Sequence, residues 1–286
     1  MLYKYFPLAR RDVIENGLLR FAQPGDFNDP FELHPSFDLM SKADIAALPQ
    51  ALEHPNMRVL TPQALQAMIA AVQPGLMTVI QEHQGMNGAY SLNNNRLAQA
   101  TLDSKFGVLC LSESPDSLLM WAHYADKHKG FVLQFDERHD FFAPTTVDGQ
   151  AFELTKIEYT DKRPVLSYST INSPSVYYRK SPEWSYEREW RLIKSLTGAA
   201  RVLEHPRYPR CLFSLPANSV TGVIIGMAVP HEERGRLFEL FSQPHLKHLT
   251  VYQTALSKDE YKLEVHPPLD GKYPPDALNG KVFEAR

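Results

Sequence analysis

The chain has 286 residues, of which 43% are apolar and 22% are charged, and its formal net charge is −3. These values are typical of a soluble globular protein with a substantial core, and they argue against an extended nucleic-acid surface, which needs clustered Lys and Arg. The sequence shows no N-terminal signal pattern and no run of about 18 apolar residues, so we expect neither secretion nor membrane insertion. Its two cysteines, Cys110 and Cys211, lie in apolar runs, as expected for a protein of the reducing cytoplasm.

The N-terminal region predicts a strand, a short helix and a second strand. In the opening LYKYFP two tyrosines alternate with Lys4, so Lys4 would project from the face opposite the tyrosines. Residues 8–16 are helical in character, and Gly17 can close this helix in a left-handed conformation. Residues 18–22 form the second apolar, strand-like run.

Residues 24–38, PGDFNDPFELHPSFD, are dense in Pro, Gly, Asn and Asp, which favours a loop with phenylalanines as anchors. Asn28 and Asp29 precede Pro30, and their side chains can hydrogen-bond the following backbone in a tight turn. The alternative is a loop that lines a pocket, with Asn28, Asp29 and Glu32 as its polar groups.

Residues 41–106 are rich in Ala, Leu, Gln and Met, with Pro and Gly as breaks, which predicts a helical insertion that covers the sheet. The C-terminal residues 267–286 are rich in Pro and Gly and predict a loose tail. We therefore expect residues 1–266 to form a single α+β domain that carries this insertion.

The middle of the chain predicts a strand, a helix and a strand. Residues 107–112 are apolar, as in a buried strand. Ser114 suits the N-cap of a helix over Pro115 to Lys129, and Gly130 can close it in the left-handed conformation. Residues 131–136 alternate as in a strand.

Trp121 and Tyr124 share one edge of the predicted helix. They are candidates either for core packing or for stacking on a ligand ring. His123 and Asp126 lie nearby, but they fit no familiar spacing of metal ligands, so we predict no metal site.

The segment EREWRL is the second informative stretch. A strand over residues 187–194 would place Glu187, Glu189 and Arg191 on one face, with about 6 to 7 Å between successive positions. One interpretation is a solvated face with ion pairing. The other is a carboxylate pair in which one member stabilises positive charge on a sugar ring and the other activates a nucleophile.

The remaining segments predict mostly strands. Residues 151–159 alternate, and the Ser-, Pro- and Tyr-rich segment that continues to residue 182 indicates a loop. Near the C-terminus, Pro230 to Phe241 has the start signals of a helix. Further strands are expected at residues 210–215, 219–227, 249–256 and 260–266. Together the elements predict an α+β fold with a mixed, largely antiparallel central sheet.

Four ordered motifs resemble the bacterial domain of unknown function 2971 family: LYKYFP near the start, FNDPFE at Phe27 to Glu32, MWAHYADKHKGFVLQFD at Met120 to Asp136 and EREWRL at Glu187 to Leu192. The resemblance spans Leu2 to about Val229. It implies an uncharacterised bacterial protein and no settled chemistry.

The chain is more distantly similar to ADP-ribosyltransferase-like folds, in which a residue on the first strand, a central aromatic residue and a late Glu surround NAD. This resemblance places Lys4 at the first of these positions and Tyr124 or Trp121 at the second. It places Glu189 at the third, with Glu187 as the first Glu of an ExE pair.

The leading hypothesis is therefore an ADP-ribosyltransferase-like enzyme that binds NAD or a related nucleotide as its substrate. Nicotinamide would leave first, while an aromatic ring stacks on the substrate and a carboxylate stabilises the oxocarbenium-like ribose. The catalytic residues would be Glu189, Glu187 and Tyr124, and the nucleotide-binding residues would be Lys4, Asn28, Asp29, Trp121 and Arg191.

Two alternatives belong to other classes. A non-catalytic binding or toxin-regulating module of phage defence is suggested by the family resemblance alone, and its partner would be a protein. A metal-dependent hydrolase or nuclease would need His123 and Asp126, or Asp29 and Glu32, to converge on a cation.

Overall fold

The computed structural model describes residues 1–33, 36–37, 100, 102–166 and 174–266. The chain divides into two compact units. The first unit comprises Met1–Ala22, Phe106–Ile157 and Glu183–Arg286, and the second comprises Gln23–Lys105 and Glu158–Pro182. The predicted helical insertion at 41–106 lies outside the described residues except for 100 and 102–106, and the predicted tail at 267–286 lies wholly outside them.

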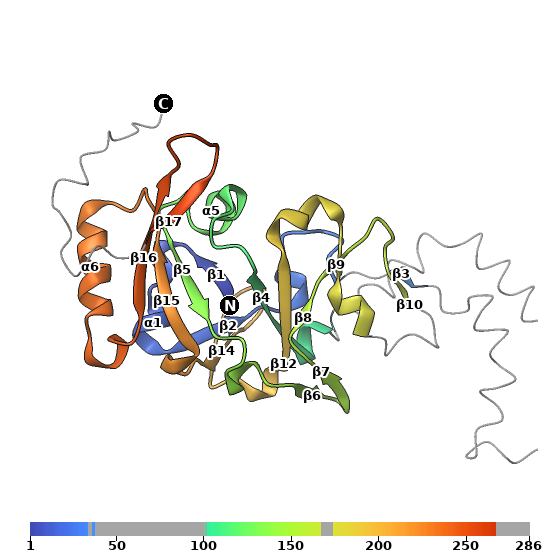
Figure 1. Ribbon diagram of the computed structural model, residues 1–286. Helices are drawn as coiled ribbons and strands as arrows, with labels where there is room; N and C mark the ends of the chain where they lie inside the picture. The colour runs from blue at the N-terminus through green and yellow to red at the C-terminus, as the bar shows by residue number, and fades with distance from the viewer. Residues whose placement is uncertain (34–35, 38–99, 101, 167–173, 267–286) are drawn as a thin grey trace, which may run out of the picture. The chain divides into compact units, whose positions relative to one another are not determined.

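The first unit contains most of the regular structure (Figure 1). Its strands are β1 (Leu2–Phe6), β2 (Leu18–Phe21), β4 (Phe106–Ser112), β5 (Phe131–Phe135), β6 (Thr145–Val147), β7 (Gln150–Phe152), β8 (Thr155–Lys156), β12 (Glu189–Ser195), β13 (Arg201–Leu203), β14 (Arg210–Ser214), β15 (Val220–Ile225), β16 (Thr250–Leu256) and β17 (Leu263–His266). Its helices are α1 (Asp12–Asn16), α5 (Leu118–Tyr124) and α6 (His231–Phe241), with short 3-10 helices η1 (Leu8–Arg10), η4 (Asp140–Phe142), η7 (Leu196–Gly198), η8 (Ala217–Ser219) and η9 (Pro244–Leu246).

The second unit has short elements where it is described. They are η2 (Pro24–Asp26), β3 (Ser36–Phe37), β9 (Glu158–Tyr159), β10 (Val165–Leu166), η5 (Pro174–Tyr178) and β11 (Arg179–Lys180). Strand β10 pairs with β3 and β11 pairs with β9, both in parallel. The segment predicted as loop up to residue 182 therefore contains short strands and a 3-10 helix.

The central feature of the first unit is an eight-stranded sheet in the order β17-β16-β15-β5-β1-β4-β12-β8. Strands β15 and β16 run parallel, and α6 connects them. All other neighbours in this sheet are antiparallel. The predicted α+β fold with a mixed, largely antiparallel sheet is thus confirmed.

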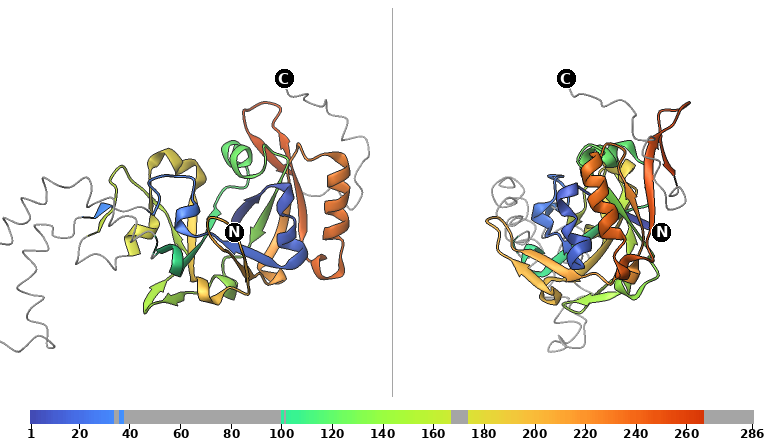
Figure 2. Two further views of the ribbon diagram at one scale, coloured as in Figure 1. Left: turned by 180° about the vertical axis from the view of Figure 1, so that it is seen from behind. Right: turned by 90° about the vertical axis from the view of Figure 1, so that its left-hand side faces the viewer.

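Strand β5 is at the centre of the core because four of its five residues are buried on one face or the other. On one face, Phe131 and Leu133 join a large apolar cluster that includes residues of α1 and α6, and the right-hand view of Figure 2 shows these two helices on the same side of β16. On the other face, Val132 joins a smaller cluster formed by α5, with Tyr5 and Trp121.

Helix α5 begins and ends inside its predicted range of Pro115 to Lys129. It spans Leu118–Tyr124, and its N-cap is Ser117, whose hydroxyl accepts a hydrogen bond from the Met120 amide at 3.4 Å. Pro115 stays outside the helix because its carbonyl accepts a hydrogen bond from the Trp121 indole N–H at 2.8 Å. A tertiary contact therefore sets where this helix starts.

The chain after α5 is unusual because Asp126, Lys127 and His128 are all left-handed, with φ of 47°, 53° and 68°. Gly130 is not, although we predicted that it would be. A Cβ at Gly130 would instead lie 2.0 Å from the Phe6 carbonyl oxygen, so glycine is needed for the close approach of two backbone segments. At Gly17 the predicted left-handed closure is confirmed, with φ of 59°.

Candidate functional site

Glu189 and Arg191 form a buried ion pair on β12. The guanidinium donates to both carboxylate oxygens, with Nε to Oε1 at 2.7 Å and Nη2 to Oε2 at 3.0 Å. Glu189 is 2% exposed and Arg191 is 0% exposed. The strand prediction correctly put them on one face, but that face is not solvated. A bidentate pair in this setting fixes both side chains rigidly.

Glu187 lies outside the strand that we predicted for it. It ends the 3-10 helix η6 (Pro182–Glu187), and Arg188 follows in the left-handed region with φ of 45°. Glu187 therefore does not continue the β12 face of Glu189. It is buried and accepts a hydrogen bond from the Tyr124 hydroxyl at 2.6 Å, and the Ser112 hydroxyl donates to its backbone carbonyl at 2.6 Å.

Lys4 lies where strands β1 and β4 diverge, since these strands register only at Tyr3 and Ser112. Its ammonium donates to the Cys110 carbonyl at 2.9 Å. Burial lowers the pKa of Lys4, and the neighbouring Cys110 and Glu189 side chains oppose this change. The negative charge of Glu189 therefore acts on Lys4, its partner in the predicted nucleotide site.

The two aromatic residues of α5 have different environments. Trp121 is 0% exposed, with its ring edge-on to Tyr5 at 5.4 Å and stacked with His128 at 6.2 Å between centroids. Burial lowers the pKa of His128. Tyr124 is half-buried, and its ring contacts His123 at the surface. Tyr124 is thus accessible to a ligand, whereas Trp121 packs in the core.

The second unit contains a pocket of about 260 Å³ whose lining residues are mainly charged and polar and come from segments 29–32, 160–164 and 179–181. We call it the Asp29 pocket. Asp29 and Glu32 line it, as the pocket interpretation of this loop required, whereas Asn28 is exposed and is not among its lining residues.

Asp29 has one satisfied and one unsatisfied carboxylate oxygen. Its Oδ1 accepts a hydrogen bond from the Phe31 amide at 2.9 Å, which confirms the predicted turn. The residue is only 3% exposed, and its buried Oδ2 has no hydrogen-bond partner among the described residues. Such an oxygen requires a donor.

Four basic side chains line the Asp29 pocket together with the acidic residues Asp29, Glu32 and Asp161. Lys180 forms a buried ion pair with Glu32 at 3.3 Å, and Arg179 pairs with Glu158 at 2.8 Å. The remaining two cations, Lys162 and Arg163, are exposed, and we call their position the mouth of the pocket. Sequence reasoning missed all four, because they follow Asp29 by more than a hundred residues in a segment that indicated only a loop.

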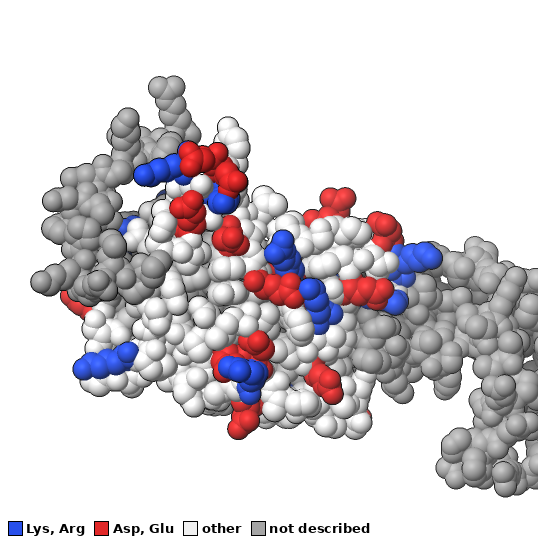
Figure 3. Space-filling model, viewed as in Figure 1, with Lys and Arg blue, Asp and Glu red and all other residues white. Residues whose placement is uncertain are grey.

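Lys162 and Arg163 are exposed residues of the pocket lining. The Arg163 guanidinium lies over the Phe31 ring, 5.6 Å from its centroid, and Phe31 is 62% exposed. On the face shown in Figure 3, acidic and basic side chains of the described residues lie beside one another, so neither sign of charge dominates it.

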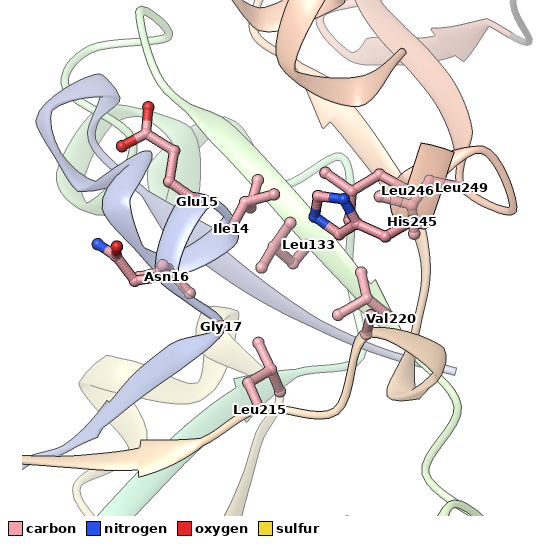
Figure 4. A pocket seen from close by; sticks show the side chains of 12 residues that line it. Ile14, Glu15, Asn16, Gly17, Leu133, Leu215, Val220, His245, Leu246 and Leu249 are labelled. Carbon is pink, nitrogen blue, oxygen red and sulfur yellow. The ribbon is translucent and has the colours of Figure 1, made fainter. Parts of the chain in front are cut away.

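A second pocket, of about 270 Å³, belongs to the first unit and is mainly apolar (Figure 4). Ile14, Leu133 and Leu246 are among its buried lining residues. His245 and Glu15 lie at its exposed rim, and the Glu15 carboxylate points away from the apolar side chains in Figure 4. It contains none of the predicted site residues.

Within the described ranges, no three His, Cys, Asp or Glu side chains lie close enough to hold a metal ion. The metal-dependent hydrolase hypothesis therefore gains no support from this part of the chain. No helix among the described residues is both long and apolar enough to cross a membrane.

Comparison with known proteins gives one match. Residues 120–192 match the family model described as Protein of unknown function (DUF2971), which confirms the predicted resemblance over the segment that holds its third and fourth motifs. The matched segment contains most of α5, all of β5 and the first four residues of β12, and hence Tyr124, Glu187 and the Glu189–Arg191 pair. Neither a curated protein nor a solved structure gave a match. The similarity to ADP-ribosyltransferase-like folds stays a prediction.

Proposed function

Because the matched segment belongs to a family without an assigned activity, we propose a function from local geometry: the Asp29 pocket binds a small phosphorylated molecule, with nucleotides such as NAD as candidates. The observation that carries this proposal is the presence of Lys162 and Arg163 at the mouth of a concave pocket. Phosphate oxygens are strong acceptors that Arg binds through its planar fork and Lys binds as a point charge.

The charges behind these two cations support the proposal. The buried Lys180 is already balanced by Glu32, and Arg179 is balanced by Glu158. No salt bridge of Lys162 is found among the described residues, and its ammonium can turn toward a ligand. An incoming phosphate would therefore meet Lys162 and Arg163 at the mouth, whereas Lys180 and Arg179 are already paired with carboxylates.

The test is calorimetric titration of the full chain with ADP and with inorganic pyrophosphate. We expect Lys162→Ala and Arg163→Ala each to weaken both ligands about 10-fold or more, because each removes a charged hydrogen-bond donor. The control is Lys262→Ala, which removes the same charge from an exposed ion pair with Glu260 in the first unit.

Lys262→Ala should leave both affinities unchanged. Increasing salt should weaken binding, because the mouth of the pocket is open to screening ions. If neither ligand binds to the wild-type chain, or if Lys262→Ala weakens binding as much as the pocket variants do, the proposal is wrong.

A second candidate function, ADP-ribosyl transfer from NAD, rests on the hydrogen bond between Tyr124 and Glu187 in the first unit. In this reaction the bond between the ribose C1′ and nicotinamide breaks, the electron pair leaves with nicotinamide, and an acceptor nucleophile bonds to C1′. A carboxylate held by a tyrosine hydroxyl can stabilise the positive charge that develops on the ribose. Glu187 is better suited than Glu189 to this role, because Arg191 occupies both oxygens of Glu189.

This candidate predicts that the full chain releases nicotinamide from NAD, and that Glu187→Gln slows the release about 100-fold. The folded fraction of the variant is checked by circular dichroism. An unchanged rate in Glu187→Gln would rule out the assigned role. If the wild-type chain released no nicotinamide, this candidate would be wrong, and the chain would be a binding module without transferase chemistry.

A further inference from the structure

We infer that the Asp29 pocket recognises the ribonucleoside part of its ligand, with Asp29 accepting hydrogen bonds from the ribose hydroxyls and Phe31 stacking on the base. This inference rests on the proposed phosphate-binding function and names the ligand class more narrowly. It makes Asp29 a specificity-determining residue, separate from the cations that hold the phosphate.

The ribose assignment rests on the Asp29 carboxylate. Its Oδ1 is committed to the Phe31 amide at 2.9 Å, so the side chain cannot rotate freely. Its Oδ2 is buried without a hydrogen-bond partner among the described residues, and the residue lines the pocket. A carboxylate oxygen only accepts hydrogen bonds, so the group that fills this position must be a donor. A phosphate cannot serve, but a hydroxyl can.

The base assignment rests on the exposed ring of Phe31. A phenylalanine that is 62% exposed at a pocket contributes little to the core. Its ring is covered on one side by the Arg163 guanidinium, 5.6 Å from the centroid. Such a platform stacks well on a nucleobase, because the ring and the guanidinium are both flat.

The short chain distance between Asp29 and Phe31, which are separated only by Pro30, and the size of the pocket support the same assignment. One tight turn holds Asp29 and Phe31 together. The carboxylate that accepts from the ribose hydroxyls and the ring that stacks on the base therefore keep a fixed separation. The pocket volume of about 260 Å³ lies just below the range of about 300–1,000 Å³ for ligand sites. It therefore suits one mononucleotide unit, with the phosphate toward Lys162, rather than a whole dinucleotide.

The test compares three ligands on the full wild-type chain by calorimetry: ADP, 2′,3′-dideoxy-ADP and inorganic pyrophosphate. We expect ADP to bind about 10- to 100-fold more tightly than the dideoxy analogue, the range expected for hydrogen bonds to a charged group. Equal affinities for these two ligands would overturn the inference, since Oδ2 would then be satisfied by water. The phosphate-binding function would still stand if pyrophosphate bound.

Two variants test which residues produce the preference for ADP. Asp29→Asn keeps an oxygen for the Phe31 amide but presents an amide N–H₂ at the other position, so the preference for ADP over the dideoxy analogue should disappear while pyrophosphate still binds. Phe31→Ala should weaken ADP about 10-fold and pyrophosphate by less, because pyrophosphate has no base to stack on the ring. A wild-type preference that survives in Asp29→Asn would contradict the assignment. If no ligand binds at all, both the inference and the proposed function fail.

Discussion

Replacing Arg191 with methionine should lower the free energy of unfolding by about 3–5 kcal/mol, the cost of removing one partner from a buried ion pair. The Glu189 carboxylate would stay in the interior without the guanidinium that now contacts both of its oxygens. Neither residue has appreciable access to water. The penalty is therefore the desolvation of an unpaired charge and not the loss of a surface contact.

This prediction is measured by urea unfolding of the full chain. The double variant Glu189→Gln/Arg191→Met should recover most of the loss, because it removes the unpaired charge. As a control, Arg138→Met breaks an ion pair in which Arg138 is fully at the surface, and the unfolding midpoint should not change. A change below about 1 kcal/mol in Arg191→Met would mean that the pair is not desolvated.

Replacing Trp121 with alanine should cost about 3–5 kcal/mol of stability, as for other large aromatic side chains removed from a core. Trp121 has no exposed surface, packs against Tyr5 and His128, and donates its indole N–H to the Pro115 carbonyl. Its removal would leave a cavity beneath α5 and an acceptor without its donor.

Trp184→Ala is the matched control, because the same side chain is half-buried there and its ring contacts Tyr186. We expect a cost of about 1 kcal/mol at this position. Both variants are compared by urea unfolding. If Trp121→Ala were no more destabilising than Trp184→Ala, Trp121 would not be a core residue, and a ligand-stacking role would be favoured again.

Much of the fold of the first unit is predictable from the sequence, because its signals are local. The alternation in LYKYFP and the apolar run of FVLQF correctly predict β1 and β5. Pro230 and the acidic residues that follow correctly predict the start of α6. These patterns depend on neighbouring residues and on the periods of strand and helix.

Features that depend on distant contacts were not predictable in this way. The start of α5 is displaced by the hydrogen bond from Trp121 to Pro115. Glu187 leaves the β12 face because Arg188 is left-handed, a conformation that the pattern EREWRL does not indicate. Similarly, Gly130 suggested a helix cap, whereas its role is the close approach to Phe6.

The candidate site shows the same division. The turn at Asp29 follows from the sequence FNDPFE, because a side chain that hydrogen-bonds two residues onward is a local feature. The cations that complete the pocket, Lys162 and Arg163, come from a distant segment with no pattern of its own. Their contribution becomes visible only when the second unit is folded.

The most direct test of the central claim is hydrogen–deuterium exchange of the full chain with and without saturating ADP. Binding in the Asp29 pocket predicts slower exchange in residues 27–33 and 158–164, because the ligand would order the turn at Asp29 and the segment that carries Lys162 and Arg163. Slower exchange confined to residues 118–131 and 187–195, around α5 and β12, or no change anywhere, would contradict it.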